Sequence, residues 1–244
     1  INKSSELTEE QLEEDINIED ENYIESEKSL IKMKKLDFVF ISGVAGSGKS
    51  HTLCKYLDYL AEKNFTDFQV LTPSGKAANV IKNKIKNDNE NFNFIKEIND
   101  LDKKISTADR YIVDSNKFWN HRLFARVDDG STPDENIDVL IIDEISMITL
   151  DTLYYILKIK KPKKLIILGD IKQLPPIGYG SLATSIYNHL FLESSICLAK
   201  METSHRADDN SQFIKHSLTL RDKEKQLKKE DLEKNIENSK EELG

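Results

Sequence analysis

Short apolar runs alternate with segments of helical periodicity along most of this chain. The runs are rich in β-branched and aliphatic residues and predict strands at residues 38–41, 68–72, 137–142, 165–168 and 195–198. Between them, apolar residues recur every three or four positions, which predicts helices at residues 51–60, 76–85, 153–159 and 181–191. The alternation predicts an α/β fold in which helices cover both faces of a mostly parallel sheet.

Two segments break this alternation. Residues 83–99 are polar and rich in asparagine, which indicates an irregular surface insertion. Residues 222–244 are rich in lysine and glutamate with sparse leucines, which indicates a charged helical tail with a thin apolar stripe.

The negative charge of the chain is concentrated near its N-terminus. The formal net charge is −8, and residues 1–30 hold eleven acidic side chains against two lysines. Residues 1–35 are therefore predicted to form an acidic leader, either a solvated helix or a disordered segment. Because the rest of the chain is close to neutral, the total charge does not argue against a nucleic-acid partner.

The hydropathy pattern and the cysteines indicate where the protein works. No apolar run approaches the roughly eighteen residues of a membrane span, and the acidic N-terminus lacks the basic-then-apolar pattern of a signal peptide. The two cysteines, Cys54 and Cys197, lie in apolar stretches typical of reduced core residues. We therefore expect a cytoplasmic protein that has no membrane partner.

A glycine-rich loop follows the first predicted strand and precedes the first predicted helix. Its sequence, Gly43-Val44-Ala45-Gly46-Ser47-Gly48-Lys49-Ser50, matches the P-loop pattern GxxxxGK[ST] in that context. Glycines let such a loop curl so that backbone N–H groups point inward at a polyphosphate, and the next helix presents its N-terminus to the same anion. Lys49 is predicted to reach the β- and γ-phosphates and Ser50 to ligate Mg²⁺. The residues predicted to bind a nucleoside triphosphate are Gly43, Gly46, Ser47, Gly48, Lys49, Ser50 and His51.

An acidic pair closes the longest apolar run. Asp143 and Glu144 follow residues 137–142, and the carboxyl end of a parallel strand would bring them beside the P-loop. Asp143 is predicted to hold Mg²⁺, and Glu144 to orient and deprotonate the attacking water. An acid placed to activate water predicts hydrolysis rather than group transfer. The alternative is a helix cap, since Asp and Glu also favour helix starts.

A third polar loop follows the strand predicted at 165–168. Gln173 has an amide that both donates and accepts hydrogen bonds, and near a γ-phosphate it could report whether that phosphate is present. Pro175 and Pro176 stiffen the exit from the loop, so that movement at Gln173 is passed on. The alternative is an ordinary polar turn ended by prolines.

Together these loops resemble the motifs of superfamily 1 helicases, specifically of their RecD-like branch. Residues 43–50 resemble motif I, residues 143–147 the DExx-type motif II, and residues 169–176 the GDxxQLPP-type motif III. Four further segments resemble motif Ia (72–78), the TIHR-type segment (106–110), motif IV (204–211) and the Q motif (7–11).

The resemblance implies roles for residues that the loops alone do not assign. It implies that Gln11 reads adenine and that Arg206 touches the γ-phosphate, acting in catalysis with Lys49, Glu144 and Gln173. It also implies contacts to single-stranded DNA from Thr72, Pro73, Ser74, Gly75, Thr107 and Arg110. Without the resemblance, Ser/Thr-Pro-Gly turns at strand ends are ordinary turn chemistry.

Residues 110–136 occupy the place where this family carries a small insertion whose tip splits the duplex. Aromatic and cationic side chains at 117–124, among them Trp119, suit stacking on a nucleotide. They equally suit a satellite hydrophobic cluster under a loop.

The predicted organisation is an acidic leader (1–35), a RecA-like P-loop ATPase domain (36–221) and a charged tail (222–244). The resemblance implies the N-terminal motor domain of a 5′-to-3′ DNA helicase that binds ATP, Mg²⁺ and single-stranded DNA. Residues 212–244 do not resemble motifs V and VI, so a second RecA-like domain is expected to complete the site. Two other hypotheses stay open: a non-motor nucleotide-binding switch, and a helicase that tracks RNA.

Overall fold

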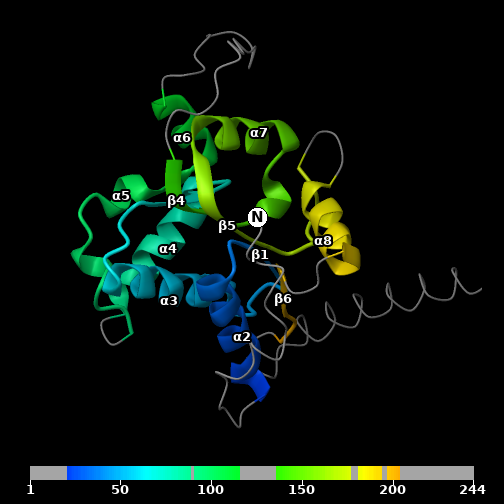
Figure 1. The fold of residues 1–244 in the computed structure, drawn as a ribbon, viewed down its shortest axis with the longest axis horizontal. Helices are drawn as coiled ribbons and strands as arrows, with labels where there is room; N and C mark the ends of the chain where they lie inside the picture. Colours follow the sequence, from blue (N-terminus) through cyan, green and yellow to red (C-terminus); the bar gives the residue numbers. More distant parts are fainter. Residues whose placement is uncertain (1–20, 89–90, 116–135, 177–180, 194–196, 204–244) are drawn as a thin grey trace, which may run out of the picture. The chain divides into compact units, whose positions relative to one another are not determined.

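Six parallel strands form the central sheet of the domain. A computed structural model describes residues 21–88, 91–115, 136–176, 181–193 and 197–203. The strands, in chain order, are β1 (Phe38–Gly43), β2 (Phe68–Thr72), β3 (Ile105–Thr107), β4 (Asn136–Ile142), β5 (Lys161–Gly169) and β6 (Leu198–Met201). They lie in the order β3-β2-β4-β5-β1-β6, and all neighbours are parallel. This sheet, with its helices, confirms the predicted α/β class (Figure 1).

Helices cover both faces of the sheet. One core lies between the sheet and α2 (Glu21–Lys35), α3 (Lys49–Glu62), α4 (Gly75–Asn87) and the short α5 (Leu101–Lys104). The other core lies between the sheet and α6 (Ala108–Asp114), α7 (Leu150–Ile159) and α8 (Leu182–Glu193). Figure 1 shows α6 and α7 across the sheet from α3 and α4. Among the helices that the structure describes, none is long and apolar enough to cross a membrane.

Alternate residues of the central strands divide between the two cores. In β4, Val139 and Ile141 pack into the core with α3, whereas Leu140 and Ile142 pack into the core with α7. All four are at most 5% exposed. Because both faces of the strand are buried, its sequence contains a nearly continuous apolar run.

The observed strands differ from the predicted strands in three places. The pattern does not predict β3, because only Ile105 of its three residues is apolar. β5 begins at Lys161, before its apolar residues, and there pairs with Asn136 of β4. β6 begins at Leu198, where the strand predicted at 195–198 ends.

Helix α2 belongs to the packed domain. Leu30 and Met33, together with Leu36 just beyond the helix, are 7%, 0% and 0% exposed and lie in the same core as α3. Lys164 Nζ donates to the backbone oxygens of Met33 and Lys34, 3.0 Å from each, near a helix end whose carbonyls lack intrahelical partners. The described part of the segment predicted as an acidic leader therefore packs with the domain, so a boundary at residue 36 is too late.

Residues 83–99 also differ from the predicted surface insertion. Helix α4 continues to Asn87, and Phe92 and Ile95 are both 0% exposed. Asp58 Oδ1 on α3 accepts the backbone N–H groups of Phe94 and Ile95 at 2.8 and 2.9 Å. Two apolar side chains spaced among asparagines produce no periodic pattern, which is why the sequence does not reveal that they are buried.

We expect Phe92→Ala to lower the free energy of unfolding by about 3–5 kcal/mol, because it empties a filled core position. Phe94→Ala is the matched control, since Phe94 is 46% exposed, and it should cost under about 1 kcal/mol. Urea unfolding of the two variants and the parent measures both values. Equal losses would contradict the burial of Phe92.

Candidate active site

The three polar loops singled out in the sequence follow three adjacent strands. β4, β5 and β1 are neighbours in the sheet, with Ile142 opposite Ile167 and Ser42 opposite Gly169. Since parallel strands end at the same edge, the loops after Gly43, Ile142 and Gly169 meet at the carboxyl edge of the sheet. This edge is the common place for ligands in open α/β sheets.

The P-loop backbone requires glycine at specific positions. Gly46 and Gly48 have φ values of 84° and 90°, which side chains rarely adopt. Gly48 is also the residue from which α3 begins. At Gly43, an added Cβ would lie 2.6 Å from Ser47 Oγ and 3.0 Å from the backbone oxygen of Met201. Close approach of the loop to itself and to β6 therefore excludes a side chain at Gly43.

Lys49, the first residue of α3, turns back over the loop. Its Nζ donates to the backbone oxygens of Gly43 at 2.8 Å and Val44 at 2.9 Å, and the residue is 7% exposed. Ser50 follows it and is half-buried. The loop thus places an ammonium group and a hydroxyl at the start of a helix, where the helix dipole favours anions.

The side chain of His51 packs away from the loop. Its ring lies 5.7 Å from that of Phe92, measured between centroids. Burial, followed by the charges of Lys84 and Lys55, lowers the pKa of His51, which favours a neutral imidazole. The structure gives this side chain a packing contact, and the nucleotide-binding role of His51 stays a prediction.

Asp143 is a buried acid at the end of β4. The residue is 4% exposed, and burial raises its pKa to about 7, with the neighbouring charge of Glu144 adding to the rise. The backbone N–H of Glu144, which donates to Asp143 Oδ1 at 3.0 Å, and the charge of Lys49 both lower that pKa. A cation beside this carboxylate would stabilise its ionised form.

Glu144 has a strained backbone and an unpaired carboxylate oxygen. Its φ of 55° is in the left-handed region, which costs a non-glycine residue roughly 1–3 kcal/mol. In the described part of the chain, its side chain does not cap the short 3₁₀ turn at Ile145–Met147. Among the described residues, the Asp143 side chain accepts a hydrogen bond only from the adjacent N–H of Glu144. Neither acid therefore caps a helix, and the helix-cap interpretation of this pair is wrong.

The residues at this edge fit a nucleotide with a cation. Among the described residues, Ser47 Oγ and Glu144 Oε2 are buried without a hydrogen-bond partner. Buried polar atoms are nearly always paired, so these two point to ligand groups. Together with the Lys49 ammonium and the Asp143 carboxylate, they offer donors for phosphate oxygens and acceptors for Mg²⁺.

Gln173 is held in a turn and reaches the acidic loop. Its backbone N–H donates to the Asp170 oxygen at 3.1 Å, which forms the turn. Its Oε1 accepts a hydrogen bond from Ser146 Oγ at 2.9 Å. The segment is therefore a polar turn, and its glutamine also contacts the loop that carries Glu144.

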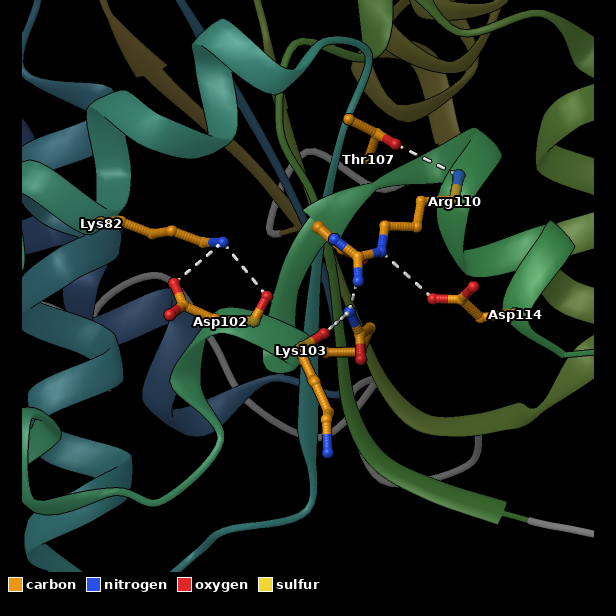
Figure 2. A network of polar contacts seen from close by, with 8 residues as sticks. Lys82, Asp102, Lys103, Thr107, Arg110 and Asp114 are labelled. Carbon is orange, nitrogen blue, oxygen red and sulfur yellow. Dashed lines mark hydrogen bonds and ion pairs between the residues drawn. The ribbon is translucent and has the colours of Figure 1, made fainter.

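The two segments expected to contact DNA lie side by side. Thr72 at the end of β2 is opposite Thr107 at the end of β3. Their hydroxyls have local partners: Thr72 Oγ1 donates to the Ser74 oxygen at 2.9 Å, and Thr107 Oγ1 accepts the Arg110 N–H at 3.1 Å (Figure 2). Ser74 caps α4 in the same way, through Ala77. Ordinary turn chemistry thus accounts for these hydroxyls, and their contacts with DNA stay a prediction.

Ion pairs lie near the second of these segments, and the pair of Arg110 and Asp114 is exposed. Arg110 Nε lies 3.2 Å from Asp114 Oδ2, and both side chains are 66% exposed. Lys82 bonds the backbone oxygen of Asp102 and its carboxylate, and this contact lowers the pKa of Asp102 (Figure 2). Exposed pairs contribute little to stability, so Arg110 can exchange Asp114 for another anion at low cost.

Several predicted site residues lie outside the described residues. They are Gln11, Trp119 and Arg206, together with most of the 110–136 segment and the tail at 222–244. Sequence reasoning, in turn, missed Ser146, Asp170 and Gly169 as parts of the site. All three lie within the two motifs of the sequence, but only the fold shows that the loop with Ser146 packs against the loop with Gly169.

The chain is similar to several known proteins. Residues 27–179 match the family described as AAA domain. The RecD subunit of the RecBCD enzyme from Buchnera aphidicola is 31% identical over 62% of this chain and 25% of its own length. DNA helicase B from Mus musculus is 36% identical over 41% of this chain and 9% of its own. A solved structure of Pif1 helicase from Candida albicans is 22% identical, with a TM-score of 0.46 over 82% of this chain and 43% of that one.

The chain spans a quarter or less of the curated relatives that it matches here. The AAA-domain match contains all three loops of the candidate site, and the RecD match supports the resemblance read from those loops. The chain belongs to the AAA domain family, within the RecD-like branch of superfamily 1 helicases.

Proposed function

We propose that this chain is the N-terminal motor domain of an ATP-dependent DNA helicase. The observation that carries the proposal is the meeting of the P-loop, the acidic pair and the Gln173 loop on three adjacent strands. A lone phosphate site needs only the first of these loops. Hydrolysis also requires an acidic residue that activates water, and an amide beside the phosphates can respond to the presence of the γ-phosphate.

Each loop supplies a distinct part of the chemistry. The P-loop N–H groups and Lys49 bind and orient the phosphates, and Glu144 takes the proton of the attacking water. Gln173 donates to the γ-phosphate through its amide. Mg²⁺, held by Ser50 and Asp143, would neutralise charge on the phosphate oxygens. The unpaired Ser47 and Glu144 oxygens and the buried Asp143 support these assignments.

The DNA track is proposed to cross the ends of β2 and β3. The adjacency of Thr72 and Thr107, and the exposure of Ser74, Gly75 and Arg110, support a continuous surface for a sugar–phosphate backbone. The name of the mouse relative, DNA helicase B, favours DNA over RNA. The 5′-to-3′ polarity and the cytoplasmic location follow only from the sequence analysis and belong to the proposal.

A second RecA-like domain is proposed to close the nucleotide site from the opposite side. The relatives extend far beyond the aligned region, and Arg206 can supply only one of the cations expected around a γ-phosphate. Movement between two domains would let the protein grip a DNA strand at two places in turn.

Glu144→Gln should separate binding from chemistry. In the intact protein the variant should bind ATP like the parent but turn it over at least ~100-fold more slowly, because it keeps the shape of the side chain and lacks a base. Lys49→Ala is the contrasting variant, since losing its charged hydrogen bonds should weaken ATP binding about 10-fold or more. Fluorescent-nucleotide titration and a phosphate-release assay measure the two quantities. Equal losses of binding and turnover in Glu144→Gln would make Glu144 a structural residue.

Residues 1–244 alone should bind nucleotide weakly and leave a tailed DNA duplex intact. The absence of an arginine from a facing domain can lower turnover by ~10³-fold. A single domain also holds the DNA strand at one place, whereas translocation needs two contacts that move relative to each other. The test is a strand-displacement assay with residues 1–244 and with a longer chain that includes the proposed second domain, on DNA and on RNA of the same sequence. ATP-driven unwinding by residues 1–244 would refute the two-domain motor. No unwinding by the longer chain would favour a nucleotide switch, and unwinding of RNA alone would identify an RNA motor.

A further inference from the structure

A side-chain hydrogen bond joins the loop after β4 to the loop after β5. Ser146 Oγ donates to Gln173 Oε1 at 2.9 Å. Ser146 is 4% exposed, so water competes little for this bond. The bond connects the segment that begins with Asp143 and Glu144 to the segment expected to respond to the γ-phosphate.

The chemistry of this bond fixes which end of the amide is free. A glutamine amide has an accepting oxygen and a donating NH₂ group on opposite sides. Because Ser146 occupies the oxygen, Nε2 is the end of Gln173 that stays available to a ligand. A phosphate oxygen can only accept, so this is the orientation that binding to a phosphate requires.

The backbone of the two loops is fixed independently of this bond. A Cβ at Gly169 would lie 2.7 Å from Ile145 Cγ2 and 3.2 Å from the backbone N of Ile145, so the loops approach as closely as glycine allows. Asp170, which is 4% exposed, accepts the Lys172 N–H through its side chain and the Gln173 N–H through its backbone. The position of Gln173 is thus set by the turn, which leaves the direction of its amide to Ser146.

We propose that Ser146 is a positioning residue for ATP hydrolysis, which holds the Gln173 amide with its NH₂ group toward the γ-phosphate. The proposal rests on the proposed ATPase function. It adds that the two loops act as one unit, since a shift of the segment that follows Glu144 moves Ser146 and the amide together. Ser146 itself does not touch the nucleotide.

Kinetics of the intact protein test this role. Ser146→Ala should lower the kcat for ATP about 10-fold and leave the ATP dissociation constant within about 2-fold. Ser146→Thr keeps the hydroxyl and should restore most of the turnover. In a Gln173→Ala background, Ser146→Ala should lower kcat no further, because the group that it orients is gone.

The chain offers a matched control for these variants. Gln69 Nε2 donates to Ser106 Oγ at 3.1 Å. This bond also joins a glutamine to a serine, but it lies between β2 and β3. Gln69→Ala removes that bond, together with the one from Nε2 to the Lys103 backbone oxygen at 3.1 Å, and should leave DNA-independent turnover unchanged. It therefore separates general loosening of the domain from loss of the oriented amide.

Side-chain NMR supplies a readout without nucleotide. Ser146→Ala should shift and broaden the side-chain NH₂ resonances of Gln173 in the nucleotide-free protein, because the amide loses its fixed direction, whereas Gln69→Ala should leave them unchanged. Unchanged Gln173 resonances, parent-like turnover of Ser146→Ala, or a further loss of kcat in the Gln173→Ala background would each overturn the proposal. A parent protein that does not hydrolyse ATP would refute the ATPase function instead, and the NMR experiment would still test the bond.

Discussion

Parallel pairing of β4, β5 and β1 is the constraint on which the site depends. Neighbouring strands lie roughly 4.8 Å apart, and the ladder sets Ile142 opposite Ile167 and Ile41 opposite Leu168. Three loops that are far apart in the sequence therefore leave the sheet side by side. Parallel strands also need crossover connections, and here helices pack on both faces. The same apolar burial thus stabilises the sheet and positions the chemistry.

The site contains groups that a core would otherwise exclude. Lys49, Asp143 and Asp170 are 7%, 4% and 4% exposed, and burying charge is costly unless it is paired. The pKa of Asp143, raised to about 7 mainly by burial, is the visible sign of that cost. The left-handed backbone of Glu144 adds strain in the same place. Such arrangements persist only where the surrounding structure fixes them, as the two cores do here.

The positions of the loops of the site could be predicted from sequence because each loop contains a recognisable motif. Gly43 to Ser50 and the Asp143–Glu144 pair follow apolar runs, and the structure places both at the predicted strand ends. Contacts between loops were beyond sequence reasoning, since Ser146 and Gln173 are far apart along the chain. Buried residues in polar surroundings were missed for a similar reason. Asparagines flank Phe92, acidic residues precede α2, and β3 has a single apolar residue. None of these segments therefore shows an apolar pattern in the sequence.

The central claim is that a nucleoside triphosphate binds at the edge where these three loops meet. A crystal structure of the protein with Mg²⁺ and a non-hydrolysable ATP analogue tests it most directly. We expect the polyphosphate within residues 43–50, with Lys49 Nζ moved from the oxygens of Gly43 and Val44 to phosphate oxygens. Nucleotide bound away from this edge, or Lys49 still bonded to both carbonyls beside a bound triphosphate, would contradict the account.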